Sequence, residues 1–366
     1  MNGLSSSLPL LLRVLRDPRQ ASTFTLADWD LLLRQSTATN LSPALLDMFE
    51  QHGLLEQMPA PARTLFEWVR PLAERHRQAV GYEVECIREA LAPTGLPLVL
   101  LKGAAYAIAG LDAGRGRLFN DVDIMVPKAR LGEVESALML HGWAAAQHDA
   151  YDQRYYREWM HELPPMQHMR RQSSIDVHHA ILPETAPVRP DPASMLAAAR
   201  PIDGVPGVAT LAPTDMVLHS AVHLFFDGEF DKGLRDLVDL QRLLREFGAQ
   251  PGFWDGLPVR ARELQLARPL FYALRYCERL LGAAVPPQVM QDAAAAGAPN
   301  RAQLWLMDHL FLRALLPLHA SCERRFGGMA RFILYVRGNW LRMPPLLLAR
   351  HLFHKAFLSP KPEPMP

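Results

Sequence analysis

The chain has 366 residues, of which 49% are hydrophobic, and a formal net charge of only +1. It is long enough to bury a sizeable core in two or three subdomains, and its charge balance does not mark it as a nucleic-acid binder. The amino-terminal residues lack the features of a signal peptide, and no apolar run reaches the roughly 18 residues of a membrane span.

Residues 1–78 are predicted to form an amino-terminal helical region. Within it, residues 25–33 combine a capping threonine with an amphipathic pattern typical of a helix. Three prolines then punctuate the chain, at Pro59, Pro61 and Pro71. We therefore expect the next helix to run from about residue 72 to residue 91 and to lead into a mixed α/β core over residues 79–185.

The core begins with residues 97–101, an apolar run that predicts a buried strand. Gly103 ends this run, and the alanine-rich residues 104–109 favour a helix. A junction of this kind directs backbone N–H groups and the positive end of the helix dipole at a ligand, for which phosphate is a natural choice. Lys102 could add a positive charge for the same phosphates.

Two acidic residues, Asp121 and Asp123, follow after a glycine-containing loop. Residues two apart in a strand point to the same side, so these carboxylates are predicted to project together while Val122 and Ile124 face a core. Carboxylates held side by side repel each other unless a cation lies between them. Oxygen ligands of this kind suit Mg²⁺.

A third carboxylate is expected, because two-metal phosphoryl transfer needs ligands that flank both ions. Residues 174–181 show another alternating pattern, in which Asp176 and His178 share one face. Residues 166–170 and the turn that follows them resemble the first arm of a hairpin. This arrangement would bring Asp176 beside Asp121 and Asp123, although Asp176 could instead be a plain surface residue.

Residues 186–212 are predicted to be a linker or a long surface loop because they include a proline-rich stretch. From residue 213 to residue 357 the pattern is helical. His219 and His223 lie four residues apart on one predicted helix, where two imidazoles could share a metal. No third ligand is evident, which favours a packed or pocket-lining role.

Arg235 and Asp239 occupy the next predicted helix at a spacing that allows an ion pair along one face. The pair could line a cleft or form a surface salt bridge. Further on, residues 313–355 hold eight basic side chains and a single acid, interleaved with aromatic residues. They are expected to be amphipathic closing helices, or alternatively a surface for an RNA or another anionic partner. The proline-rich residues 358–366 are predicted to be disordered.

Over roughly residues 80–245 the chain resembles the poorly characterised bacterial nucleotidyltransferase family of the DNA polymerase beta-like superfamily. The resemblance rests on the Leu101-Lys102-Gly103 turn, the Asn120-Asp121-Val122-Asp123 strand with Arg117 before it, and Ile175-Asp176-Val177-His178. It implies an α+β fold with a mixed sheet, flanking helices and helical subdomains at both ends. It also implies that Asp121, Asp123 and Asp176 hold two Mg²⁺ ions, for which Mn²⁺ could substitute.

The resemblance further implies that Gly103 and Ala104 form the turn that holds the triphosphate. Ala104 departs from the serine or glycine that is usual there, which leaves only backbone N–H groups and Lys102 for the phosphates. Arg117 matches a basic position suited to phosphate or substrate, although it could be a solvated loop arginine. His178 could orient Asp176 or the acceptor, and Arg235 with Asp239 matches a recurring pair in the family's helical half.

The leading hypothesis from the sequence is therefore a nucleotidyltransferase that moves a nucleoside monophosphate from an NTP to an acceptor, which could be a small molecule, a peptide or an RNA. One alternative is a nucleotide-binding scaffold that no longer turns over, as Ala104 suggests. Another is a toxin-like enzyme that modifies tRNA. The three cysteines, Cys86, Cys277 and Cys322, lie far apart and are expected to be free thiols in a reducing cytoplasm.

Overall fold

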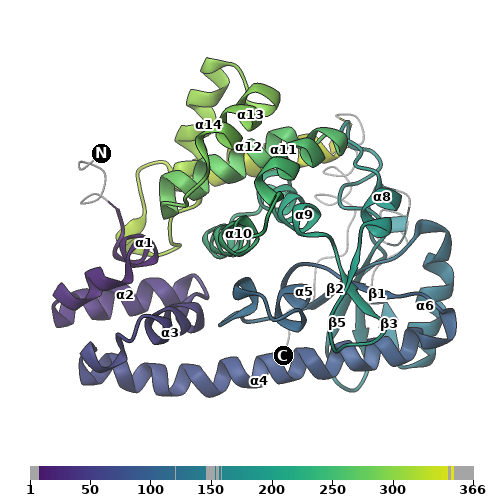
Figure 1. Ribbon diagram of the computed structural model, residues 1–366, viewed down its shortest axis with the longest axis horizontal. Coiled ribbons are helices and arrows are strands. Elements are labelled where there is room, and N and C mark those ends of the chain that lie inside the picture. Colours follow the sequence, from purple (N-terminus) through teal and green to yellow (C-terminus); the bar gives the residue numbers. More distant parts are fainter. Residues whose placement is uncertain are drawn as a thin grey trace.

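The computed structural model describes residues 8–119, 121–145, 153, 156–157, 159–344 and 348–349. It has an α+β fold in which helices flank a seven-stranded mixed sheet (Figure 1), which confirms the predicted fold class. Within these described ranges, no helix is both long and apolar enough to cross a membrane. The tail at residues 358–366 lies outside the described residues, so its disorder stays a prediction.

The sheet has the strand order β3-β4-β5-β2-β1-β7-β6. Its strands are β1 (Leu98–Leu100), β2 (Asp121–Met125), β3 (Trp143–Ala145), β4 (Met166–His168), β5 (Ser174–His178), β6 (Arg200–Pro201) and β7 (Val208–Thr210). Strand β2 is antiparallel to β1 and parallel to β5, and β4 with β5 forms the predicted hairpin. The two strands that carry the predicted acidic residues are therefore neighbours in the sheet.

Alternation along β2 and β5 gives the sheet one apolar face and one acidic face. Val122 and Ile124 of β2, like Ile175 and Val177 of β5, are almost fully buried in a continuous hydrophobic core. This core extends from the amino-terminal helices, through the sheet, to the carboxy-terminal helices. The residues between these apolar positions are left to face the other side.

The amino-terminal region is helical, as predicted, with α1 (Leu10–Arg16), α2 (Leu26–Ala38), α3 (Ser42–Gln51) and α4 (Ala60–Leu91). Thr25 caps α2 in a reciprocal capping box with Asp28. The start expected near residue 72 is wrong, because α4 begins at Ala60 and continues through Pro71. Pro71 is exposed, and apolar side chains on both sides of it are buried, so packing outweighs the cost of roughly 3 kcal/mol for an interior proline.

Helix α4 runs along one side of the molecule, from α2 and α3 at one end to the sheet at the other (Figure 1). It packs against β1, β2 and two short helices of the core, α5 (Lys102–Ile108) and α6 (Leu131–Leu140). Short 3₁₀ turns join several elements, at Pro18–Thr23, Leu55–Gln57, Ala92–Thr94, Asp112–Gly114, Lys128–Arg130 and Ala320–Cys322.

The segment 186–212, predicted as a linker, is instead partly built into the sheet. It contains α8 (Pro192–Ala197), whose amino end is capped by Asp191, followed by β6 and β7. Strand β7 pairs in parallel with β1 and therefore extends the sheet beyond the strands that carry the acidic residues. A strand of three residues is too short to show a periodic pattern in the sequence.

The carboxy-terminal half is a set of helices, α9 (Pro213–Phe226), α10 (Gly233–Gly248), α11 (Phe253–Glu263), α12 (Ala267–Tyr276), α13 (Pro287–Gly297), α14 (Arg301–Ala314) and α15 (Gly327–Arg342). A π-helical turn follows α12 at Cys277–Leu281. Helix α9 is buried on almost all sides between α10, α11, α12 and α15.

Two arginines of the predicted basic stretch point into the molecule. Arg337 donates to the carbonyl of Phe225 and lies over the ring of Tyr272, while Arg342 contacts Asp227. Arg350 and Lys355 lie outside the described residues. The three cysteines are unpaired, as expected.

Candidate active site

The predicted carboxylates meet on the acidic face of β2 and β5. Because these strands are parallel, the register places Asp123 directly opposite Asp176, with Asp121 one step along the same face. Asp121 is exposed, whereas Asp123 is only 5% exposed. Sequence alternation alone therefore gave the correct face and the correct neighbours for the three side chains.

These carboxylates strongly affect one another. Burial and the negative charges of Asp123, Glu162 and Asp121 raise the pKa of Asp176 to about 7. Burial also disfavours the charge on Asp123, yet Lys102 and His178 hold its pKa well below the usual range. A further cation at this face would relieve the remaining repulsion.

The ammonium group of Lys102 pairs with Asp123. Its Nζ lies 3.0 Å from Oδ1 of Asp123, so it neutralises a carboxylate rather than standing free for a phosphate. Burial alone would lower the pKa of Lys102, but Asp123 raises it above the ordinary value. The backbone at Lys102 is left-handed, with φ of 45°, a conformation that is uncommon for a residue other than glycine. The sequence gives no sign of this conformation.

Gly103 provides space for Arg117. A Cβ atom at Gly103 would lie 2.7 Å from Nη1 of Arg117 and 3.1 Å from the ring of Phe119. Arg117 also lies over the ring of Tyr106 and forms an ion pair with Asp239. Arg117 is therefore a largely buried residue of the cleft, not a solvated loop arginine.

Ala104 points away from the cleft and is only 2% exposed. Lys102 and Gly103 line the cleft beside it. The side chain at this position packs in the core, so Ala104 can reach a phosphate only through its backbone N–H.

The predicted ion pair between Arg235 and Asp239 does not form. Arg235 bonds instead to its neighbour Asp236, through Nε at 3.1 Å and Nη2 at 2.8 Å. Asp239 faces Arg117 across the interface, with 3.2 Å between Nη1 and Oδ2. Arg235 and Asp239 are both buried, so neither forms a salt bridge at the surface. A buried carboxylate is stabilised by a cation beside it, and for Asp239 that cation is Arg117.

His178 lies between two acidic side chains. Its Nε2 is 2.9 Å from Oδ1 of Asp123, and its Nδ1 is 3.2 Å from Oε2 of Glu162. His178 thus contacts Asp123 rather than Asp176. The sequence analysis did not identify Glu162 or its neighbour His161. These residues reach β5 through an isolated bridge between Glu162 and His178, which no periodic pattern in the sequence indicates.

A second acidic wall, also missed, faces the strands from the helical half. The chain between α9 and α10 lines the cleft with Asp227, Glu229, Asp231 and Lys232, and α10 adds Asp236. The cleft has a volume of about 230 Å³ and includes Asp121, Asp123 and Arg117. Residues on such a loop show no periodic pattern, so a single sequence does not predict which way their side chains point.

The two helical histidines fit the packed and pocket-lining role. His219 is 4% exposed, and burial lowers its pKa well below the ordinary value. His223 lines the cleft and contacts Asp227 through Nδ1 at 2.6 Å, with Asp236 further away at 3.8 Å from Nε2.

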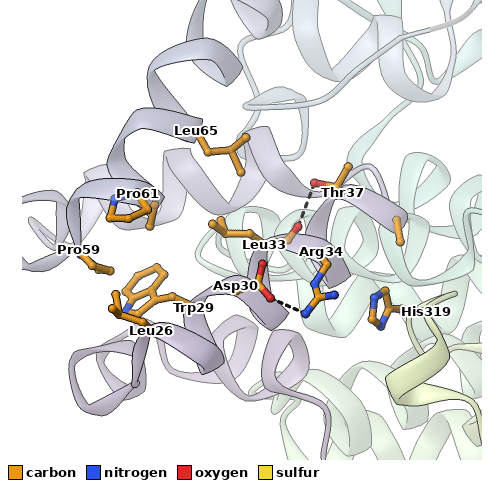
Figure 2. Close-up of a pocket in the computed structure, with 12 residues that line it drawn as sticks. Leu26, Trp29, Asp30, Leu33, Arg34, Thr37, Pro59, Pro61, Leu65 and His319 are labelled. Atoms are coloured by element: carbon orange, nitrogen blue, oxygen red, sulfur yellow. Dashed lines mark hydrogen bonds and ion pairs between the residues drawn. The ribbon is translucent and has the colours of Figure 1, made fainter.

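A larger cavity of about 710 Å³ lies away from the carboxylates, in the amino-terminal helical region (Figure 2). Leu26, Trp29 and Leu33 of α2 face Pro61 and Leu65 of α4 across it. Its only ion pair in the view joins Asp30 and Arg34, at its rim. Asp30 is the acidic residue among those that line this cavity, so the cavity lacks the group of carboxylates found at the sheet.

Comparison with known proteins gives one match. A family model described as an uncharacterised nucleotidyltransferase matches residues 25–282. The matched region spans α2 to the turn after α12 and so includes every carboxylate of the cleft. No curated protein and no solved structure matches the chain.

Proposed function

Since the chain belongs to this uncharacterised nucleotidyltransferase family, we propose that it transfers a nucleoside monophosphate from an NTP to a hydroxyl or phosphate acceptor. The acceptor oxygen attacks the α-phosphorus, the bond from that phosphorus to the bridging oxygen breaks, and pyrophosphate leaves with the electron pair. The observation that carries this proposal is the common face of Asp121, Asp123 and Asp176 on two paired strands.

The donor set is suited to Mg²⁺, because oxygen ligands are the ones this ion prefers. Oδ1 of Asp123 is already engaged by Lys102 and His178, so this carboxylate would offer Oδ2. Asp121 is exposed to the cleft, and Asp176 lies beside Asp123. When bound, Mg²⁺ ions would neutralise the triphosphate and the charge that develops during transfer.

Positive side chains in the same cleft would hold the phosphates. Nε of Arg117 is buried and makes no hydrogen bond, which leaves a donor for an anion beside the ion pair of Nη1 with Asp239. Arg235 lines the same cleft from α10. Gly103 contributes by leaving room for Arg117, and Lys102 would contribute once a cation takes its place at Asp123.

The acceptor would be activated from the β5 side of the face. A carboxylate oxygen of Asp176 would take the proton of an acceptor hydroxyl, a role supported by the position of Asp176 next to Asp123. His178 would hold Asp123 in position through Nε2. In this arrangement Asp121 and Asp123 would bind the metal ions, while Asp176 would serve both as a ligand and as the proton acceptor.

The proposal is tested with the full-length protein, Mg²⁺ and each of the four α-labelled NTPs, in the presence of a cell lysate. We expect pyrophosphate release and one class of labelled product, which mass spectrometry identifies as a small molecule, a peptide or an RNA. Asp123→Asn should reduce the rate by about 10³-fold or more, because a ligand that shapes the transition state is lost.

The matched control is Asp30→Asn, since Asp30 is an exposed residue of α2 paired with Arg34 far from the cleft. Full activity in Asp123→Asn would contradict the proposal. Calorimetry separates the remaining alternative: NTP binding without turnover across a broad panel of acceptors would identify a nucleotide-binding scaffold.

A further inference from the structure

Two imidazoles and a carboxylate converge behind the cleft carboxylates. His161, Glu162 and His178 each place one ligand atom so that the three atoms lie within 4.8 Å of one another. Backbone hydrogen bonds hold this arrangement, since Leu163 donates to Val177 and His179 donates to His161. The segment before β4 is thereby fixed to the end of β5.

The hydrogen bonding of His178 leaves one of its nitrogens unexplained. A carboxylate only accepts, so Nε2 carries the proton in its contact with Asp123. Nδ1 is buried, makes no hydrogen bond and lies 3.2 Å from a carboxylate oxygen of Glu162. In the neutral ring this places a lone pair against an anionic oxygen, and either a proton or a bound cation at Nδ1 would remove the repulsion.

His161 repeats the same feature. Its Nδ1 is also buried and without a hydrogen-bond partner. Its ring lies 5.4 Å from the ring of His178 at a tilt of 34°, so the two are not stacked face to face. Each of the two rings therefore has a buried nitrogen without a hydrogen-bond partner, although buried polar atoms normally find partners.

We propose that His161, Glu162 and His178 bind a divalent first-row transition metal ion, separate from the Mg²⁺ expected at Asp121 and Asp176. Two imidazoles and one carboxylate suit Zn²⁺ and its neighbours, whereas Mg²⁺ prefers oxygen ligands alone. Bonds of about 2.1 Å place opposite donors no more than about 4.2 Å apart, so small side-chain rotations complete the site.

His178 connects this site to the cleft. Its Nδ1 would bind the ion while its Nε2–H donates to Asp123, which is the usual carboxylate–histidine–metal arrangement. The ion would lie one imidazole ring away from Asp123 and would fix its orientation. The inference does not depend on nucleotidyl transfer, because the donors converge whatever reaction the cleft performs.

The test uses full-length protein from which any affinity tag has been removed, since oligohistidine tags bind Zn²⁺ themselves. Elemental analysis after purification, together with titration by Co²⁺ followed through its visible absorption, measures stoichiometry and affinity. With excess Mg²⁺ present to occupy the carboxylates of the cleft, we expect about one transition-metal ion per chain, and binding at least tenfold weaker in His161→Ala and Glu162→Gln. His141→Ala is the control, because His141 is exposed and contacts only the carbonyl of Ala137 in its own helix.

Glu162→Gln keeps the shape of the side chain, so circular dichroism and a thermal melt can establish that this variant folds. A titration without stoichiometric Co²⁺ binding, or His161→Ala that binds as tightly as the unmodified chain, would overturn the inference. Asp121→Asn separates the two sites: it should lose transfer and retain the transition metal. Loss of Co²⁺ binding in Asp121→Asn would place the ion at the cleft carboxylates instead and contradict the proposal.

Discussion

Arg117, from the loop before β2, and Asp239, from α10, form an ion pair across the boundary between the sheet and the helical half. Nη1 and Oδ2 are 3.2 Å apart, and the two side chains are only 11% and 9% exposed. The pair holds a guanidinium over Gly103 at the edge of the cleft. The same ion pair therefore contributes to the stability of this boundary and fixes the position of the guanidinium that we propose to bind phosphate.

Asp239→Asn should destabilise the chain by about 3 kcal/mol, because it leaves the charge of Arg117 buried without its partner. Urea unfolding at pH 7.5 measures the change. Arg117→Met combined with Asp239→Asn should recover part of the loss, since neither charge then remains. Asp255→Asn on the exposed side of α11 is the control. Equal stability of Asp239→Asn and this control would show that Arg117 finds sufficient partners elsewhere.

Gly103→Ala should weaken NTP binding without unfolding the chain. The added methyl group would meet Arg117 at 2.7 Å and force its guanidinium from the position held by Asp239 and Tyr106. We expect KM for the NTP to rise about tenfold, which corresponds to about 1.4 kcal/mol. The control is Gly132→Ala in α6, where no atom lies within 4 Å of the added Cβ. An unchanged KM in Gly103→Ala would mean that Arg117 does not contact the nucleotide.

Lys102→Met should strengthen Mg²⁺ binding in the absence of nucleotide, because the ammonium group that competes for Asp123 is removed. The same change should raise KM for the NTP, since a positive charge is lost from the cleft. Competition with Mn²⁺, followed by electron paramagnetic resonance, measures the metal affinity. Lys128→Met, at an exposed pair with Glu184, serves as the control. Weaker metal binding in Lys102→Met would show that Lys102 helps to assemble the carboxylates.

The contribution of Asp176 to the stability of the metal-free chain should fall as pH rises from about 4 to about 7. The folded chain holds the proton of Asp176 up to about pH 7, whereas the unfolded chain releases it near pH 3.8, so the folded state binds more protons in this window. At about 1.4 kcal/mol for each pKa unit, the loss reaches at most about 4 kcal/mol.

Thermal melts at several pH values, with and without Mg²⁺, check this dependence. Asp176→Asn should melt with a smaller pH dependence, and Mg²⁺ should reduce the dependence of the unmodified chain. Parallel curves for Asp176→Asn and the unmodified chain would show that Asp176 does not retain its proton in the folded state.

The acidic face could be predicted from the sequence because it depends on a local pattern, the alternation of residues along each strand. Alternation around Asp121 and Asp176 fixes which side each residue faces, and burial of Val122 and Val177 leaves no other choice. Glu162 and Asp227 lie outside regular strands, so their approach to the face depends on tertiary packing that no residue pattern records. The residue pattern therefore predicted the acidic face of the sheet but not the opposite wall of the cleft.

The errors have equally specific causes. Proline is a reliable sign of a break only where packing does not override it, and the buried face of α4 does so at Pro71. The sheet extends into segment 186–212 through β7, which is too short to show alternation. The spacing of Arg235 and Asp239 permitted an ion pair. In the folded chain Arg235 instead contacts Asp236, and Asp239 contacts Arg117.

The parallel pairing of β2 with β5 has a consequence for the order of folding. Parallel strands cannot be joined by a tight turn, so β3, β4 and α6 must all be in place between them. Contacts between residues this far apart in the chain form late, because the entropy of closing a long loop opposes them. We therefore expect Asp123 and Asp176 to come together late in folding, so that a partly folded chain would lack the acidic face.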